Sequence, residues 1–340
     1  MIIDLRSDTV TKPSAKMKEA MMNAKLGDDV FEDDPSVNEL QEKAADMFGM
    51  EASIYCPSGT MTNQIAIKLH TQPGDELICD RHSHVYNYEG GGIAFNSGVS
   101  VRLVEGNLGR ISSEQILSNI NPDDVHYPNT SLVSLENTIN RAGGICYDLS
   151  EINSLSKVCA DNKIAIHMDG ARLFNAIVKT KTASRDYGKS LDSISICMSK
   201  GLGCPVGSLL IGKKDFIKRA RRIRKVFGGG MRQAGVIAAA AHYALDNNIE
   251  RLQTDHNNAS IINQCLSDLD YIGKTEPCET NIVIFELSDP SIESAFMQHL
   301  EVNNVKCAFI GTGRIRFVTH MDISSLMIEK IQEILTSFKG

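Results

Sequence analysis

The stretch that decides the fold reads Ser193-Ile-Ser-Ile-Cys-Met-Ser-Lys200, followed by Gly-Leu-Gly-Cys-Pro-Val-Gly207. Serine and isoleucine alternate before the run turns apolar, which is typical of a strand with at least one buried face. Lys200 stands where this strand must end, because the glycines and the proline that follow interrupt regular structure. We therefore expect a lysine at the carboxyl end of a buried strand.

Two interpretations of Lys200 are open. Ammonium groups are rarely left in apolar surroundings without a function. A desolvated amine gives up its proton more readily, and the neutral amine can attack a carbonyl group to form a Schiff base. The flanking glycines would let a flat ligand approach the backbone. The alternative is a strand-end lysine whose ammonium group extends into solvent.

The length and net charge of the chain limit the classes of protein to which it can belong. A chain of 340 residues is long enough for one large and one smaller domain. We expect the large domain, which includes the N-terminal segment, over residues 1–245 and the smaller domain over residues 246–340. The formal net charge of −7 gives no reason to expect nucleic acid or an anionic membrane as partner. Apolar residues interrupt the basic run 213–225, which predicts an amphipathic helix with a solvated basic face.

The cysteines and the N-terminus indicate the compartment. Nine cysteines are scattered without a C-x-x-C pair. The charged N-terminus does not resemble a signal peptide, and no apolar run approaches the length of a membrane span. We expect a protein of the reducing cytoplasm.

Strand-like and helix-like segments alternate through the first two thirds of the chain. This predicts an α/β fold with a mostly parallel sheet, helices on both faces, and ligands at the carboxyl ends of strands. After Gly230 the pattern changes to long helices and a few strands, which predicts a smaller α+β domain. Expected strands are Ala52 to Cys56, Glu76 to Asp80, Val99 to Glu105, Ser131 to Glu136, Lys163 to Met168, the strand before Lys200, Ile282 to Glu286, Val305 to Ile310 and Arg314 to Thr319.

Candidate site residues follow several of these strands. Asp169 could pair with a protonated ring nitrogen, or it could cap the helix that Gly170 introduces. Ser58-Gly59-Thr60 precedes a helix, where free N–H groups bind a phosphate, although a simple capped helix start has the same pattern. Asn137 could donate a hydrogen bond to a ring substituent.

Histidines and arginines complete the set. His84 could stack on a flat cofactor or act as a base, and His126 is a weaker candidate for the same roles. Both are otherwise surface histidines. Arg172 and Arg316 could bind a substrate carboxylate, whereas the default for Arg316 is a surface strand position. Together these groups match what pyridoxal phosphate requires when it acts on an amino acid. Dinucleotide, P-loop, zincin and G-x-S-x-G motifs are missing from the sequence, and we expect no metal site.

These residues lie in motifs that resemble the low-specificity threonine aldolases, of the β-eliminating lyase group within the fold-type-I pyridoxal phosphate enzymes. The resemblance covers nearly the whole chain, and several of its motifs are specific in this order. They are Asp4–Pro13, Gly27-Asp-Asp-Val30, Asp33-Asp-Pro35, Pro57-Ser-Gly-Thr60, His84–Glu89, Leu135-Glu-Asn-Thr138, His167–Arg172, Ser199–Gly203, Gly228–Gln233 and Arg316–His320.

The resemblance implies a seven-stranded large domain, a role for each candidate, and a cytoplasmic homotetramer with active sites at a dimer interface. Implied roles are cofactor attachment for Lys200, contact with the pyridine nitrogen for Asp169, phosphate binding for Ser58, Gly59, Thr60 and Arg232 from a neighbouring subunit, ring contacts for His84, Asn137 and Arg172, and carboxylate binding for Ser7, Arg172 and Arg316. His84 and His126 would lie near the substrate hydroxyl, with His84 as the base and His126 fixing the hydroxyl.

The implied reaction is retro-aldol cleavage of L-threonine or L-allo-threonine to glycine and acetaldehyde. The alternatives are another pyridoxal phosphate-dependent reaction of a small amino acid, such as β-elimination, racemisation or transamination, and a binding protein that kept the fold. Two positions depart from the expected motifs: Phe31 stands where many relatives have tyrosine, and Ile139 where histidine is common. Both put the stereochemical preference in doubt.

Overall fold

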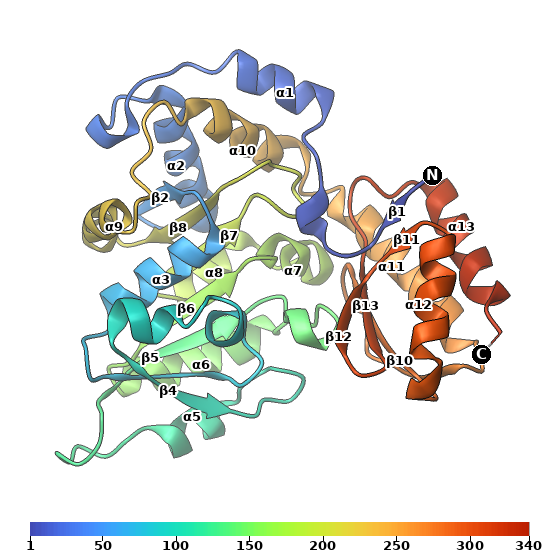
Figure 1. Ribbon diagram of the computed structural model, residues 1–340. Helices are drawn as coiled ribbons and strands as arrows, with labels where there is room; N and C mark the ends of the chain where they lie inside the picture. The colour runs from blue at the N-terminus through green and yellow to red at the C-terminus, as the bar shows by residue number, and fades with distance from the viewer. Residues whose placement is uncertain (340) are drawn as a thin grey trace.

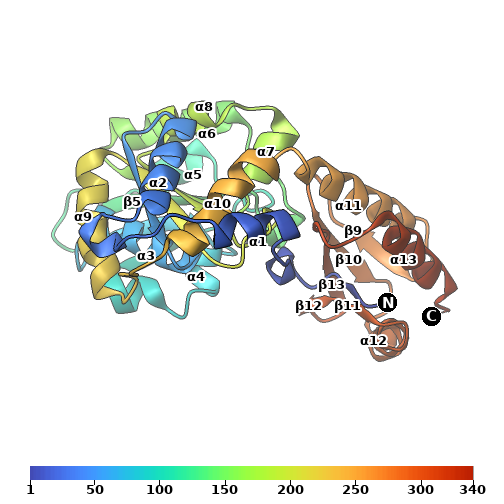
Figure 2. The ribbon, with the colours of Figure 1, turned by 90° about the horizontal axis from the view of Figure 1, so that it is seen from above.

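The structure is a computed structural model, and it describes residues 1–339. Figures 1 and 2 show two lobes, with residues 252–339 forming most of the smaller one and the N-terminus lying against it. A seven-stranded sheet in the order β2-β8-β7-β6-β5-β3-β4 forms the centre of the larger lobe. This confirms the expected α/β class with a mostly parallel seven-stranded sheet. Its strands are β2 (Ala52–Cys56), β3 (Glu76–Asp80), β4 (Ser100–Val104), β5 (Thr130–Glu136), β6 (Ala165–Gly170), β7 (Ser193–Cys197) and β8 (Ser208–Gly212).

Strand β8 is absent from the expected strands because it follows directly on the glycine-rich stretch after Lys200. It runs antiparallel to both of its neighbours, β2 and β7, while the other strand pairs are parallel. The helices of this lobe are α1 (Ala15–Met22), α2 (Pro35–Phe48), α3 (Gly59–His70), α4 (His84–Asn87), α5 (Ser113–Asn119), α6 (Leu149–Asp161), α7 (Leu173–Thr180), α8 (Ser184–Ser190), α9 (Lys214–Val226) and α10 (Gly235–Asn247).

Alternation along the strands sends side chains into two different layers. On β7, Ile194 and Ile196 enter the largest apolar core, which also holds residues of α2, α6, α7 and α10. Ser193 and Ser195 point to the opposite face, where they bond to side chains of α3. Both faces of β7 are therefore buried, because residues in a strand alternate between the two sides of the sheet.

The smaller lobe has its own apolar core of buried residues from the N- and C-terminal parts of the chain. A four-stranded antiparallel sheet in the order β12-β13-β10-β9 packs with three helices. Its elements are α11 (Leu252–Ser267), β9 (Ile272–Thr275), β10 (Ile282–Leu287), α12 (Glu293–Val302), β11 (Val305–Lys306), β12 (Ala308–Gly311), β13 (Arg314–Val318) and α13 (Ser325–Ser337).

The N-terminal strand β1 (Ile3–Asp4) pairs with β11 of the smaller lobe, although we expected the N-terminal segment with the large domain. Ile3 of this strand and Leu5, directly after it, are buried in the smaller lobe's core. The chain then crosses to the larger lobe, and the domain boundary at residue 245 stays a prediction. Within residues 1–339, no helix is long and apolar enough to cross a membrane.

Candidate active site

The carboxyl ends of three neighbouring parallel strands form the centre of the site. Glu136 at the end of β5 is in register with Asp169 on β6, and Asp169 is in register with Ser195 on β7. Lys200 comes three residues after β7, and its carbonyl accepts a hydrogen bond from the Thr11 hydroxyl at 3.0 Å. Parallel strands thus bring residues that are far apart in sequence to one edge of the sheet.

The N-terminus of α3 lies beside the end of β7. The Ser58 hydroxyl accepts a hydrogen bond from the N–H of Met61 and caps the helix. A Cβ on Gly59 would lie 2.5 Å from the sulfur of Cys197, so only glycine lets the helix start this close to the strand. The first-turn N–H groups of a helix have no partner within the helix and form an anion site. Ser58, Gly59 and Thr60 therefore stand at a place suited to a phosphate.

His84 opens the short helix α4 and is held by two carboxylates. Its backbone N–H donates to Glu136 Oε2 at 2.7 Å, and its ring Nδ1 lies 3.0 Å from Glu89 Oε1. Burial by itself lowers the pKa of His84, but the carboxylates of Glu89, Asp169 and Glu136 outweigh burial and raise it above its ordinary value. The ring is thus fixed at the site and more basic than a free histidine.

Glu136 is itself perturbed by this crowding of carboxylates. Burial and the neighbouring charge of Asp169 raise the pKa of Glu136 to about 6, against the opposing effect of N–H groups donated by Asn140 and His84. Neither Glu89 nor Glu136 was among the expected site residues. Both lie in motifs that the sequence singled out, Glu89 five residues after His84 and Glu136 directly before Asn137.

Several buried polar atoms at this edge of the sheet have no hydrogen-bond partner in the structure. Asp169 Oδ1 accepts from the N–H of Ala171 at 3.1 Å, but Oδ2 is buried and unpaired. Both amide atoms of Asn137 are also buried and unpaired. Because buried polar groups are nearly always bonded, these atoms indicate a missing polar ligand. A protonated ring nitrogen facing Asp169 fits this arrangement, so the residues fit pyridoxal phosphate.

His84, Glu89 and Asp169 also bring one nitrogen and two carboxylate groups within 4.8 Å of one another, a spacing that could hold a metal ion. Both oxygens of Glu89 already accept N–H groups, from Asn63 at 2.8 Å and Gln64 at 2.7 Å. We therefore interpret the three residues as a hydrogen-bonded cluster.

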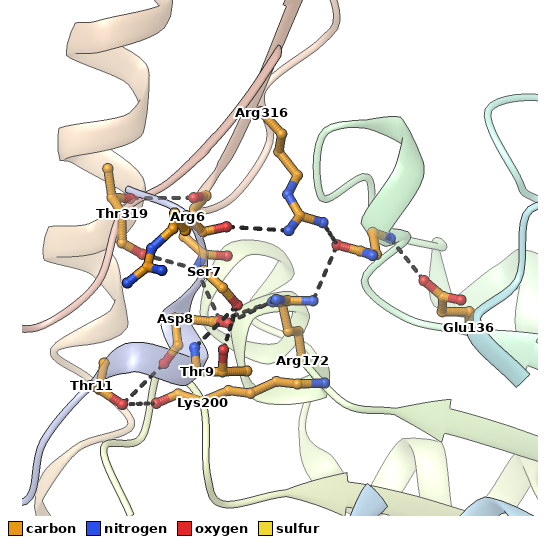
Figure 3. Close-up of polar contacts among 12 residues, drawn as sticks. Arg6, Ser7, Asp8, Thr9, Thr11, Glu136, Arg172, Lys200, Arg316 and Thr319 are labelled. Atoms are coloured by element: carbon orange, nitrogen blue, oxygen red, sulfur yellow. Dashed lines mark hydrogen bonds and ion pairs between the residues drawn. The ribbon is translucent and has the colours of Figure 1, made fainter. Parts of the chain in front are cut away.

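A second cluster joins the N-terminal segment to both lobes (Figure 3). Arg172 donates through Nε and Nη2 to the two oxygens of Asp8, at 2.9 and 2.7 Å, and both side chains are buried. Asn281 of the smaller lobe donates to the same carboxylate. Burial by itself raises the pKa of Asp8, but Arg172, Lys200 and Asn281 lower it to about 2. Asp8 thus engages two of the three donor nitrogens of Arg172.

Arg316 reaches the same place from β13. Its Nη1 donates to Asn140 Oδ1 at 2.9 Å, and Arg172 Nη1 lies 3.5 Å from the same oxygen. The Nε of Arg316 is buried without a partner. Burial and the positive charge of Arg172 lower the pKa of Arg316 to about 10. Two guanidinium groups with one balancing carboxylate, Asp8, leave a positive site that suits a substrate carboxylate.

Ser7, His126 and Arg232 differ in how the chain places them. Ser7 caps a short turn beside Asp8 and accepts hydrogen bonds from Thr9. His126 has an 82% exposed side chain and contacts Asp124 on an exposed loop, and Arg232 is half exposed and pairs with Asp28. Within residues 1–339 of one chain, no recorded contact joins either side chain to the residues around Lys200.

Comparisons with known proteins cover most or all of the chain. The family model described as "Beta-eliminating lyase" matches residues 4–290. The "Low specificity L-threonine aldolase" of Escherichia coli O157:H7 is 40% identical over 340 residues, covering all of this chain and 99% of the relative. "Low-specificity L-threonine aldolase 1" of Arabidopsis thaliana is 38% identical over 95% of this chain and 92% of that protein. The solved threonine aldolase of Leishmania major has a TM-score of 0.86, covers 98% of both chains and is 20% identical, which shows the fold alone.

Proposed function

The chain belongs to the β-eliminating lyase family, and we propose from this premise that it is a threonine aldolase. It is a carbon–carbon lyase that depends on pyridoxal phosphate and cleaves L-threonine or L-allo-threonine to glycine and acetaldehyde. The observation that carries the proposal is the unpaired, buried Oδ2 of Asp169 on β6, next to the strand β7 that Lys200 follows, in a chain 40% identical to a curated aldolase over its whole length.

The cofactor would be held by groups from four elements. Lys200 would bind it covalently, Asp169 would face the ring nitrogen, and His84 would cover one face of the ring. The start of α3, with Ser58, Gly59 and Thr60, would hold the phosphate. When bound, pyridoxal phosphate supplies a conjugated ring that takes up the electron pair of the broken Cα–Cβ bond. Asp169 favours this by keeping a negative charge beside the ring nitrogen.

The substrate would be oriented by its carboxylate. Arg316 offers an unpaired Nε and shares Asn140 with Arg172, while Asp8 fixes Arg172 in place. Binding the substrate carboxylate in one place determines which bond at Cα stands perpendicular to the cofactor ring. His84 would then accept the proton of the β-hydroxyl group, which is required for the Cα–Cβ bond to break.

We also propose that the protein is a cytoplasmic homotetramer whose active sites are shared across a dimer interface. This would give His126 and Arg232, which one chain leaves exposed, a place at a neighbouring site. Its metabolic role would be threonine breakdown and glycine formation. Analytical ultracentrifugation tests the assembly, and mixing Lys200→Ala with Arg232→Ala subunits tests shared sites, because hybrid dimers would regain activity.

The reaction is tested by an absorption spectrum before and after each substrate is added, together with an assay for acetaldehyde. Wild type is expected to show the band of the lysine-bound cofactor and to release acetaldehyde. Lys200→Ala is expected to lose both. Lys213→Ala is the matched control, because Lys213 also follows a strand of this sheet, but at the opposite edge where antiparallel β8 ends. A band without acetaldehyde would contradict the aldolase and leave another reaction of the family.

A further inference from the structure

A line of polar side chains crosses the interface between the sheet and helix α3, beneath the site. His167 on β6 and Ser193 on β7 point away from the main apolar core and toward α3, and both are fully buried. Asn63 on α3 is buried opposite them, and His70 ends the same helix. An apolar interface would be the default here, since each buried polar group must be paired to avoid a large desolvation cost.

Hydrogen bonds join these side chains without a gap. His70 Nε2 lies 2.8 Å from Ser193 Oγ, and that oxygen lies 2.8 Å from His167 Nδ1. His167 Nε2 lies 3.1 Å from Asn63 Oδ1. On its other side, the Asn63 amide donates to Glu89 Oε1 at 2.8 Å. Glu89 Oε1 is also the atom that His84 Nδ1 contacts at 3.0 Å.

The inventory of donors and acceptors fixes the direction of each bond. Three nitrogens, from Asn63, Gln64 and His84, converge on the two oxygens of Glu89, which is the donor set that an ionised carboxylate accepts. The amide nitrogen of Asn63 therefore faces Glu89, and its carbonyl oxygen faces His167. That oxygen needs a donor, so His167 carries its proton on Nε2.

The directions of the hydrogen bonds at the His70 end of the line are then determined as well. Burial lowers the pKa of His167 to about 3, so the ring is neutral and its Nδ1 is an acceptor. Ser193 must donate its one proton to that Nδ1 and accept from His70 Nε2. Burial lowers the pKa of His70 to about 4, so this ring is neutral too. Every donor in the line points toward Glu89, and no member can rotate its amide or tautomer without losing a bond.

We propose that Glu89 is a positioning residue that holds His84 as the Nδ1–H tautomer, with Nε2 free to accept the proton of the substrate hydroxyl, and that Asn63 and His167 fix Glu89 in this role. The proposal rests on the proposed function for the identity of that hydroxyl. Residues of α3 and β6 thereby take part in the chemistry without touching the substrate. A His84 ring with the opposite tautomer would present a donor to the hydroxyl group and could not act as its base.

The charged groups that face His84 come from three elements, and Glu89 is distinct among them. Glu136 at the end of β5 bonds to the backbone N–H of His84, and Asp169 on β6 acts on the ring only through its charge. Glu89, from the segment after α4, contacts the ring directly. The ring of Tyr88, centred 5.6 Å from that of His84, lies tilted against it. Replacing Glu89 therefore removes both the ring contact and the largest single favourable effect on the imidazolium ion.

The tautomer is measured first in wild-type apoenzyme by solid-state NMR with ¹⁵N-labelled histidine, with His84 assigned by its loss in His84→Gln. The expected signals are a protonated Nδ1 and an unprotonated Nε2 above the pKa of His84. A protonated Nε2 would overturn the proposal. This measurement needs neither the cofactor nor turnover, so a wild-type protein that makes no acetaldehyde would refute the proposed function and leave the tautomer result standing.

The variant Glu89→Gln is tested by hydrogen exchange at the histidine C2 position, read by mass spectrometry across pH. The His84 pKa is expected to fall by at least about one unit, and the acid limb of kcat/KM to shift the same way, with kcat about 10- to 100-fold lower. Asp246→Asn is the matched control, because its contact with the Nδ1 atom of His242 on α10 is of the same kind but involves no residue of the site. It should leave the pKa of His84 unchanged.

The outcomes separate positioning from a merely structural role. A Glu89→Gln protein with lower stability but an unshifted His84 pKa and an unshifted acid limb would contradict the proposal. Glu89→Asp keeps the charge and is expected to restore part of the shift. If Glu89→Gln does not fold, the wild-type tautomer measurement still decides the question.

Discussion

Asp8 and Arg172 form a bidentate ion pair although 164 residues separate them in sequence, with Nε–Oδ2 and Nη2–Oδ1 distances of 2.9 and 2.7 Å. Asp8 precedes the first helix of the chain, and Arg172 precedes α7 at the carboxyl edge of the large sheet. Asn281 of the smaller lobe bonds to the same carboxylate. The pair thus joins the N-terminal segment, the large sheet and the small lobe beside Lys200 (Figure 3).

Asp8→Asn is expected to destabilise the apoprotein by about 3–5 kcal/mol, because it leaves the buried Arg172 without a balancing charge. Urea denaturation measures the change. Asp4→Asn is the control, since its partner Arg6 is exposed to solvent and the pair should contribute much less to stability. Equal losses of stability in the two variants would show that the buried pair of Asp8 and Arg172 contributes no more than the pair of Asp4 and Arg6.

The contribution of Asp8 should depend on pH in a defined direction. Its pKa is about 2 in the folded protein, below its ordinary value of 3.8. A lowered folded pKa gives stability that is present above the unfolded pKa and is lost as the pH falls toward the folded pKa. The stability difference between wild type and Asp8→Asn should therefore be constant above pH 5 and about 1 kcal/mol smaller at pH 3. A constant difference down to pH 3 would contradict the shift.

Arg316→Lys is expected to raise the KM for threonine at least about tenfold, because a lysine cannot present a planar fork to a carboxylate. The change in kcat should be smaller. Arg314→Lys is the matched control on the same strand, where Arg314 pairs with Glu276 and Glu286 instead. Steady-state kinetics on both variants provide the comparison, and a similar rise in both would remove Arg316 from substrate binding.

Gly59→Ala should destabilise the protein and weaken cofactor binding, because the new methyl group would lie 2.5 Å from the Cys197 sulfur. Overpacking of this kind typically costs about 1–3 kcal/mol. Cys197→Ala removes that sulfur, so the double variant should recover part of both losses. A double-mutant cycle in stability and in cofactor Kd measures the coupling, and strictly additive effects would contradict the close approach.

Asp169→Asn should leave the apoprotein as stable as wild type or more stable, while activity falls about 100-fold or more. The amide can still accept from Ala171, and it replaces an unpaired carboxylate oxygen. The charge opposite the ring nitrogen is lost, however. Thermal melting without cofactor and the acetaldehyde assay give the two readouts. A clear loss of apoprotein stability would mean that the unpaired oxygen has a structural partner.

Local patterns were sufficient for much of the large sheet. Strands β2 and β3 have the expected bounds because turn residues flank short apolar runs on both sides. Strand β8 was missed because the pattern before it is rich in glycine, and its antiparallel direction depends on pairing with β2 and β7. The pairing of β1 with β11 has no local signal at all, since each strand has only two residues.

Within the site, the sequence by itself determined which chemical groups are present: a lysine after a buried strand, an acid at the end of the neighbouring strand, and a glycine where α3 begins. Strand ends and helix starts are encoded locally, and parallel topology places them at one edge. Only the tertiary structure decided what those groups do to one another. Asp8 occupies Arg172, Asn140 joins Arg172 to Arg316, and Glu89 meets His84 at the end of a buried line of polar side chains. These contacts depend on packing between segments that are distant in the sequence, and a hydrogen bond forms only when its two groups meet, so no local pattern records them.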